Sequence, residues 1–127
     1  MNLLRSLSSG ALLSGLLLAT SAPALAAGNP AKGKAVFARC AMCHTTQPGV
    51  NRVGPSLAGV VGRKAGTAKG YAFSPAMKKY AKVWNAATLG AYLAAPTRTV
   101  PGTKMAFAGV PNPAERADLI AYLQSAR

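Results

Sequence analysis

One pentapeptide, Cys40-Ala41-Met42-Cys43-His44, constrains this chain more than any other stretch, because it holds both cysteines and the only histidine of 127 residues. Cys-x-x-Cys-His is the spacing at which two thiols can add to the two vinyl groups of one haem, with the histidine placed to bind the iron. The thioether bonds consume both thiols, so neither is left for redox chemistry. The motif therefore favours one covalently bound haem c per chain.

Three other interpretations fit part of the pentapeptide. A thioredoxin-like redox pair also uses Cys-x-x-Cys, but it requires a strand-to-helix turn within a βαβ pattern. A structural zinc site requires about four ligands, whereas Cys40, Cys43 and His44 supply three crowded ones with no second cluster. A chance match of a short motif is the third interpretation, and only the rest of the chain can decide against it.

The first 26 residues are typical of a cleaved secretory signal peptide. Arg5 gives a short positive region, an apolar stretch follows over 12–19, and Ala24-Leu25-Ala26 is a small-x-small cleavage site. An uncleaved membrane anchor is the alternative, but the apolar stretch is shorter than the roughly 20 residues that span a bilayer. The sequence thus predicts export to the periplasm, no stable membrane insertion, and a single mature domain over 27–127.

The charge balance limits the possible partners. Fifteen Lys and Arg residues stand against two acids, and removal of Arg5 with the signal lowers the net charge from +13 to +12. Such a field attracts acidic proteins, nucleic acid or anionic membrane surfaces. An exported protein rarely meets nucleic acid, and the sequence carries no recognisable nucleic-acid module. The small apolar core of one such domain is marginal alone, and a haem would complete it.

Helix-start signals recur along the mature chain, and no strand pattern is found in it. A cap residue followed by proline at the first helical position recurs at Asn29, Ser74 and Asn112, and Asn85 caps a further helix. These signals predict four helices, over 31 to about 42, 76–81, 86–95 ended by Pro96, and 113 to about 125, separated by irregular runs over 45–73 and 96–111. The prediction from these signals is an all-α fold with large loops and no internal repeat.

One glycine inside the first predicted helix predicts a close crossing. Gly33 costs roughly 1 kcal/mol there relative to alanine. Such a residue makes most sense where another backbone passes close by.

The second axial ligand of the iron cannot be a histidine of this chain, which leaves lysine and methionine. Met42 lies between the two cysteines and cannot reach the opposite face of the haem. Met77 falls in a short predicted helix, where packing in the core is its expected role. Met105 falls in an irregular loop that can approach from the far side. A thioether is a soft ligand that favours reduced iron, so Met105 is the preferred candidate.

With these residues in place, the chain resembles the class I c-type cytochromes, in particular the mitochondrial cytochrome c and bacterial cytochrome c2 group. The resemblance extends from Gly33 to Leu123 and rests on several motifs besides the pentapeptide. They are Gly33-Lys34-x-x-Phe37, Gly54-Pro55-Ser56-Leu57, Gly62-Arg63-Lys64, Trp84, Tyr92-Leu93, Pro96, Pro101-Gly102-Thr103-Lys104-Met105 and the run from Glu115 to Leu123.

The resemblance implies a role for each of these residues around one haem. Cys40 and Cys43 would hold it covalently, and His44 and Met105 would be its axial iron ligands. The carbonyl of Pro55 would accept a hydrogen bond from the imidazole of His44 and fix that ring. Further cofactor contacts would come from the propionate-side residues Arg63, Trp84 and Thr103, and from Tyr92 beside the methionine sulfur. The fold would be the small class I cytochrome c fold, in which the terminal helices cross and two shorter helices and large loops surround one covalent haem. Gly33 and Phe37 would cross the last helix at Leu119 and Tyr122.

The chain also departs from the family pattern. Phe73 falls where the family often has a tyrosine that donates to a propionate, so one donor is predicted to be missing. Asn51 stands in place of a histidine that pins the loops of mitochondrial members. Thr97 and Ala35 replace lysines that commonly surround the exposed haem edge. Positive charge is kept on that rim by Arg39, Arg52, Arg98 and Lys104.

The function that the resemblance implies is electron transfer, not enzymatic catalysis. A monomeric carrier would exchange single electrons at the haem edge with acidic redox proteins. A bc1-type complex and a terminal oxidase are the family's partners, and a dehydrogenase or photosynthetic centre is equally compatible with the sequence. Two alternatives stay open: a haem enzyme or gas sensor with an open iron position, and a basic nucleic-acid or membrane-surface binder.

Overall fold

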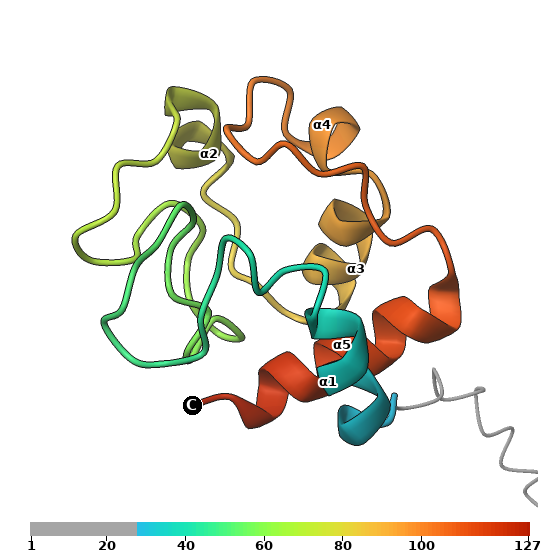
Figure 1. Cartoon of the computed structure of the whole chain (residues 1–127). Coiled ribbons are helices and arrows are strands. Elements are labelled where there is room, and N and C mark those ends of the chain that lie inside the picture. Colours follow the sequence, from blue (N-terminus) through green and yellow to red (C-terminus); the bar gives the residue numbers. More distant parts are fainter. Residues whose placement is uncertain (1–27) are drawn as a thin grey trace, which may run out of the picture.

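The computed structural model describes residues 28–127, and this part of the chain forms five helices joined by long loops (Figure 1). They are α1 Pro30–Phe37, α2 Pro75–Tyr80, α3 Ala86–Ala94, α4 Pro96–Thr99 and α5 Pro113–Ser125. Within residues 28–127 there is no strand, only an isolated bridge between Lys64 and Val83. The all-α prediction is therefore confirmed. The predicted signal peptide, residues 1–26, lies outside the described residues.

Four of these helices begin where the caps predicted. The side-chain oxygen of Asn29 accepts hydrogen bonds from the backbone N–H groups of the first turn of α1, and that of Asn112 does the same for α5. Ser74 caps α2 in the same way. At α3, Asn85 and Thr88 form a reciprocal capping box. These local hydrogen bonds satisfy donors that have no partner inside the helix, which is why the starts could be predicted from sequence.

One helix boundary differs from the predictions, and one short helix was not predicted. The first helix ends at Phe37 instead of near Met42, because the following N–H groups of Ala38 and Arg39 bond to carbonyls three residues back, at 3.2 and 3.1 Å. These tighter turns replace α-helical geometry just before the cysteines. The helix α3 ends at Ala94, before Pro96 as predicted, and Pro96 also begins the short α4, which was not predicted. A proline at the first helical position has a helical φ and lacks an N–H that would have no partner there.

The terminal helices cross at Gly33, where the sequence predicted a close backbone and the resemblance implied the last helix. A Cβ atom on Gly33 would lie 1.9 Å from the carbonyl oxygen of Asp118 in α5, so the two backbones meet at this point. Beside it, the rings of Phe37 and Tyr122 pack with centroids 5.3 Å apart. Arg39, just after α1, donates two hydrogen bonds of 3.0 Å to the carboxylate of Glu115. Packing and an ion pair thus fix the start of the pentapeptide relative to α5.

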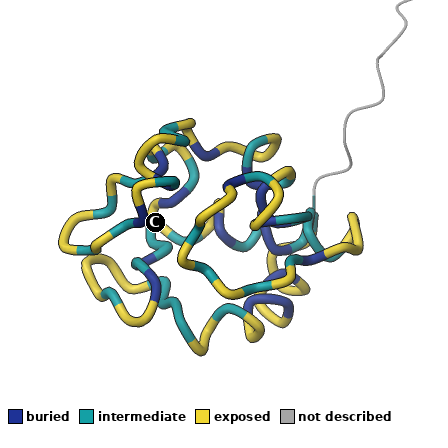
Figure 2. The backbone as a smooth tube through the Cα atoms, turned by 90° about the horizontal axis from the view of Figure 1, so that it is seen from above, coloured by how far each residue is buried: buried dark blue, intermediate teal, exposed yellow. Residues whose placement is uncertain are grey.

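The loops of the 38–73 segment lie on one side of the molecule, and α3, α4 and the following loop lie on the other (Figure 1). Buried residues occur in short stretches along both sides, separated by exposed ones (Figure 2). Asn51 connects two of these loops, because its amide accepts from the N–H of Ser56 at 2.9 Å and donates to the carbonyl of Lys69 at 3.0 Å. Asn51, which stands in place of the family's histidine, therefore still holds these two loops together.

No helix among residues 28–127 combines the length and the apolar character needed to cross a bilayer.

Candidate functional site

A cavity of about 500 Å³ lies between the two sides of the molecule, and it gathers every site residue predicted from the sequence. Its lining is mainly apolar, with side chains such as Leu57, Val60, Leu93 and Phe107. The predicted residues that line it are Cys40, Cys43, His44, Pro55, Arg63, Trp84, Tyr92, Thr103 and Met105. Residues far apart in the sequence therefore converge on one apolar space.

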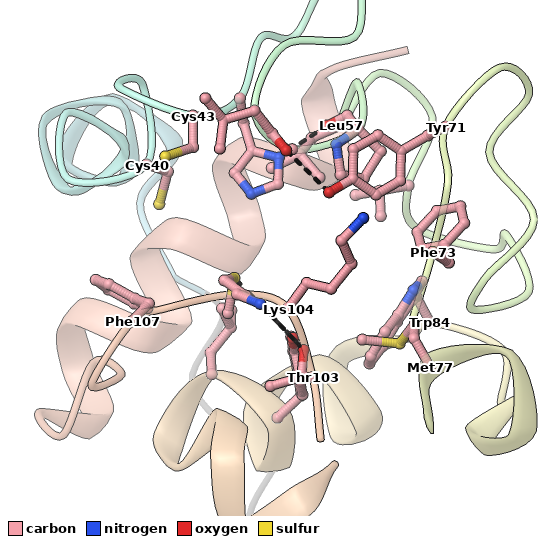
Figure 3. Close-up of a pocket in the computed structure, with 18 of the residues that line it drawn as sticks. Cys40, Cys43, Leu57, Tyr71, Phe73, Met77, Trp84, Thr103, Lys104 and Phe107 are labelled. Atoms are coloured by element: carbon pink, nitrogen blue, oxygen red, sulfur yellow. Dashed lines mark hydrogen bonds between the residues drawn. The ribbon is translucent and has the colours of Figure 1, made fainter. Parts of the chain in front are cut away.

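Both cysteines of the pentapeptide line the cavity, and no disulfide joins them (Figure 3). The tight turns after α1 place Cys40 and Cys43 next to each other at one edge of the cavity (Figure 3). Burial raises the pKa of Cys40, so its thiol carries a proton in the protein without cofactor. Among residues 28–127 no group of three or more His, Cys, Asp or Glu side chains is placed to hold a metal ion, as the zinc alternative would require.

The imidazole of His44 is held in one orientation. Its Nδ1 lies 2.7 Å from the carbonyl oxygen of Pro55, which makes Nδ1 the donor and leaves Nε2 to bind a metal. Burial lowers the pKa of His44, and the hydrogen bond to Pro55 opposes that shift. The ring therefore favours the neutral form that an iron ligand requires. Gly54 packs directly against it, since a Cβ there would lie 2.3 Å from Cε1 of His44.

The loop after α4 brings a thioether into the cavity. The hydroxyl of Tyr92 lies 4.0 Å from Sδ of Met105 and 3.2 Å from Oγ1 of Thr103. Oγ1 of Thr103 in turn accepts a hydrogen bond of 3.4 Å from the backbone N–H of Met105. Burial raises the pKa of Tyr92, with a smaller opposing effect of Thr103, so its hydroxyl stays protonated and can donate. Met105 is thus held by a small polar network within an apolar wall.

Arg63 and Trp84 lie together because their backbones pair. The N–H of Trp84 donates to the carbonyl of Arg63 at 2.9 Å, and the N–H of Gly62 donates to the carbonyl of Trp84 at 2.7 Å. The guanidinium of Arg63 donates to the carbonyls of Ser56 and Ala58, and burial lowers its pKa. The single ion pair within residues 28–127 is the one between Arg39 and Glu115. A partly buried arginine without an acidic partner at this wall suits an anionic cofactor group.

Tyr71 is a cavity residue that sequence reasoning missed. The prediction considered only Phe73 in this loop and therefore expected a donor to be missing. The structure brings both rings to the cavity, packed edge to face with centroids 4.8 Å apart. The hydroxyl of Tyr71 donates to the carbonyl of Val53 at 2.9 Å. A second aromatic residue two positions before Phe73 was the available signal, because residues two apart in an extended segment lie on the same face.

Lys104 closes one edge of the cavity. Its side chain extends from the loop of Thr103 toward Tyr71 (Figure 3), where Nζ donates to the carbonyl of Ala72 at 2.7 Å. The same ammonium lies 5.3 Å from the centroid of the Tyr71 ring. The charge predicted for the rim at this position therefore also ties two loops together.

The mouth of the cavity is exposed and carries cationic and apolar groups. Met42 and Val53 line it and are 83% and 75% exposed. Arg39 and Lys104 also line the cavity, whereas Arg52 lies near it through a hydrogen bond of 3.2 Å to the carbonyl of Ala41. Arg98 is placed apart, at the end of α4. Three of the four predicted rim charges are therefore at or beside the mouth.

These donors fit a haem. Two thiols lie three residues apart, an oriented imidazole and a thioether line the same apolar space, and a guanidinium without an acidic partner stands at its wall. Cys40 and Cys43 would form the thioethers, while the apolar walls would cover the porphyrin faces.

Comparison with known proteins agrees with this site. The sequence profile described as Cytochrome c matches residues 30–127. Cytochrome c2 of Rhodoblastus acidophilus is 52% identical over 98 residues, which are 76% of this chain and 92% of that protein. Cytochrome c2 of Rhodomicrobium vannielii is 50% identical over 113 residues, covering 86% of this chain and 88% of the relative.

A solved structure shares the fold. The structure of cytochrome cH from Methylobacterium extorquens superposes with a TM-score of 0.73 and 49% identity, covering 77% of this chain and 99% of that one. The chain therefore belongs to the cytochrome c family, as a class I c-type cytochrome that transfers electrons and carries one haem c bound covalently through its two cysteines.

Proposed function

We propose that the protein is a periplasmic electron carrier whose haem iron is held by His44 on one side and Met105 on the other. The observation that carries this proposal is the convergence of one oriented imidazole and one thioether on the cavity that the two cysteines line. The bound haem supplies one-electron chemistry, as its iron alternates between the ferrous and ferric states.

The residues of this chain set the conditions for that chemistry. Pro55 fixes the ring of His44 and increases its basicity through the hydrogen bond at Nδ1. Tyr92 and Thr103 hold the Met105 loop, so the thioether needs little movement to bind. Arg63, Trp84 and Thr103 are the proposed contacts of the haem propionates. Two fixed ligands in a packed site leave little to reorganise when an electron is gained or lost.

The partners are proposed to be acidic redox proteins that dock at the cavity mouth. Arg39, Arg52 and Lys104 surround that mouth with positive charge, and the exposed Met42 and Val53 supply apolar contact at its centre. Charge complementarity of this kind raises the association rate and permits short-lived complexes. Within the family pattern, a bc1-type complex and a terminal oxidase, or a dehydrogenase, are the expected donor and acceptor. The periplasmic location follows from the export signal predicted over residues 1–26.

The ligand assignment is tested by exchanging methionines one at a time in the holoprotein. Met105→Ala is expected to abolish the absorption band that reports methionine bound to ferric iron and to lower the reduction potential. Met77→Ala is the matched control, because Met77 also lines the cavity but packs in the core with 8% exposure. The band should survive that change. If Met77→Ala removed the band and Met105→Ala preserved it, the assignment would be wrong.

A further inference from the structure

Three aromatic rings form a continuous row from the thioether of Met105 to the surface at the end of α2. The hydroxyl of Tyr92 lies 4.0 Å from Sδ of Met105. The ring of Tyr92 packs on that of Trp84 with centroids 5.1 Å apart, and Trp84 packs on Tyr80 at 5.5 Å. Tyr92 and Trp84 are both 6% exposed, whereas Tyr80, the last residue of α2, is half-buried.

The composition of this row separates it from the other aromatic contacts of residues 28–127. The pair Phe37–Tyr122 and the pair Tyr71–Phe73 each contain a phenylalanine, which proteins do not oxidise under mild conditions. The row Tyr92–Trp84–Tyr80 contains only oxidisable rings. For packing alone, phenylalanine would serve as well at Tyr80. Tyr92 and Trp84 also have hydrogen-bonding roles at the site, but all three rings can be oxidised, and a chemical role of the row would use that shared property.

We propose that Tyr92, Trp84 and Tyr80 form an escape route that carries an oxidising equivalent from the haem site to the protein surface. This function goes beyond carrying electrons between partners, because it does not use the cavity mouth. The route operates when the haem protein reacts with a hydroperoxide. Because consecutive rings are in contact, an electron can move stepwise from Tyr80 through Trp84 and Tyr92 toward the haem site.

The electron balance of this reaction can be written with hydrogen peroxide as the oxidant. Hydrogen peroxide accepts two electrons and two protons, its O–O bond breaks, and two water molecules form. Both electrons come from Tyr80 by way of Trp84 and Tyr92, one in each of two successive steps between which Tyr80 is restored, and the two protons are taken from solvent. Tyr80 releases its phenolic proton to solvent and becomes a neutral radical. A small reductant such as ascorbate then returns a hydrogen atom to it.

The surroundings favour Tyr80 as the end of the route. The ammonium of Lys82 lies 5.4 Å from the centroid of the Tyr80 ring, so a positive charge on that ring is disfavoured and loss of the phenolic proton is required. Tyr92, in contrast, is buried, and burial raises the pKa of its hydroxyl. The phenolic proton is therefore lost to solvent, and a neutral radical forms, more easily at the half-buried Tyr80 than at Tyr92 inside the cavity. Moving it there protects Met105 from oxidation to the sulfoxide, which would change the chemistry of the thioether.

The proposal is tested on ferric holoprotein treated with a fixed dose of hydrogen peroxide and a radical-trapping nitrone. Peptide mass spectrometry then locates the trapped adduct and measures the fraction of Met105 sulfoxide. In the unchanged protein the adduct is expected on Tyr80. In Tyr80→Phe that adduct is lost, and the Met105 sulfoxide fraction at least doubles. Trp84→Phe, which interrupts the row, should have the same two effects where it folds with haem.

Tyr122→Phe is the matched control, because it removes a phenol of similar exposure that packs on Phe37 outside the row. It should leave both the Tyr80 adduct and the sulfoxide fraction as in the unchanged protein. The proposal is overturned if Tyr80→Phe gives the same sulfoxide fraction as Tyr122→Phe, or if the adducts are spread equally over Tyr80 and Tyr122. The rate of reduction by ascorbate, measured in parallel, reports electron carrying separately.

Discussion

The backbone of Gly54 lies against the imidazole of His44 so closely that a Cβ atom there would stand 2.3 Å from Cε1 and 2.8 Å from Nε2 of the ring. Pro55, the next residue, accepts the hydrogen bond from Nδ1 of the same ring at 2.7 Å. Two consecutive residues thus fix the ring's position and its orientation.

This contact predicts that Gly54→Ala displaces the proposed proximal ligand. Overpacking of this kind costs about 1–3 kcal/mol of unfolding free energy, because neither the ring nor the backbone can move without breaking the bond to Pro55. Chemical denaturation measures the loss, and the reduction potential of the holoprotein should shift as well. A variant with unchanged stability and potential would show that the ring has room to move.

A second prediction compares two helical glycines that differ only in their neighbours. Gly33→Ala places a Cβ 1.9 Å from the carbonyl oxygen of Asp118 and must separate α1 from α5. Gly90→Ala in α3 meets only Cδ1 of Ile120, at 3.9 Å. Helix propensity favours alanine at both sites by roughly 1 kcal/mol. We therefore expect Gly90→Ala to raise the free energy of unfolding and Gly33→Ala to lower it. If both substitutions changed the free energy of unfolding in the same direction, α1 and α5 would not cross as closely as described.

The third prediction concerns the pH dependence of the loop contact at Asn51. This amide accepts from Ser56 and donates to Lys69, and it does not titrate. A neutral imidazole can also accept and donate, but a protonated one can only donate. In Asn51→His the folded state therefore depresses the pKa of the new group. The stabilisation by the hydrogen bond that this imidazole accepts is present above its unfolded-state pKa of about 6.5. It is lost as pH falls below that pKa.

Denaturation midpoints at pH 7 and pH 5 check this prediction. From pH 7 to pH 5, the free energy of unfolding of Asn51→His should fall by about 1 kcal/mol more than that of the unchanged protein, which is the contribution of one hydrogen bond. Asn51→Ala serves as the control, because it removes both bonds at every pH and adds no titrating group. A pH response of Asn51→Ala equal to that of Asn51→His would contradict the linkage.

The fourth prediction uses the two acids of α5 to test docking at the cavity mouth. Glu115 pairs with Arg39, which lines the cavity, and the paired carboxylate raises the pKa of Arg39. Asp118 instead accepts a hydrogen bond of 2.7 Å from the N–H of Asn29, at the far end of α1. Glu115→Gln removes negative charge beside the mouth and keeps a hydrogen-bond acceptor. It should raise the association rate with an acidic redox partner by about twofold at low salt.

Asp118→Asn makes the same change in net charge away from the mouth, so it should alter that rate less. Stopped-flow electron transfer at several salt concentrations measures both variants, and the difference should vanish as salt screens the charges. Equal acceleration by the two variants, or a rate insensitive to salt, would mean that partners do not dock at the mouth.

Much of this protein could be predicted from sequence because the informative signals are local. Asn29, Ser74, Asn85 and Asn112 satisfy the free N–H groups of the turn that follows each of them, and those helix starts were confirmed. The cost of Gly33 in a helix interior predicted that another backbone passes close by, and the family resemblance implied that this is the last helix. The pentapeptide pointed to haem because its spacing has few other uses, and the comparisons confirmed the family.

The loops could not be predicted in this way, because they have no hydrophobic period and their conformation depends on contacts between distant residues. The contact of Tyr71 with the carbonyl of Val53 and the bond from Lys104 to Ala72 join segments that the sequence separates. The early end of α1 at Phe37 depends on the turns that place the cysteines. Which atoms bind the iron remains a prediction, although the structure brings the candidates to one cavity.

The sequence by itself thus determined the helix starts, the haem motif and the reason for a glycine in α1, since each depends on residues near one another along the chain. The tertiary structure alone decided that Tyr71 joins Phe73 at the cavity, that Arg63 stands beside Trp84, and that the oxidisable rings form a row. Those arrangements depend on backbone pairing and side-chain packing between segments far apart in sequence. Spacing along the chain carries no information about such distances until the chain has folded.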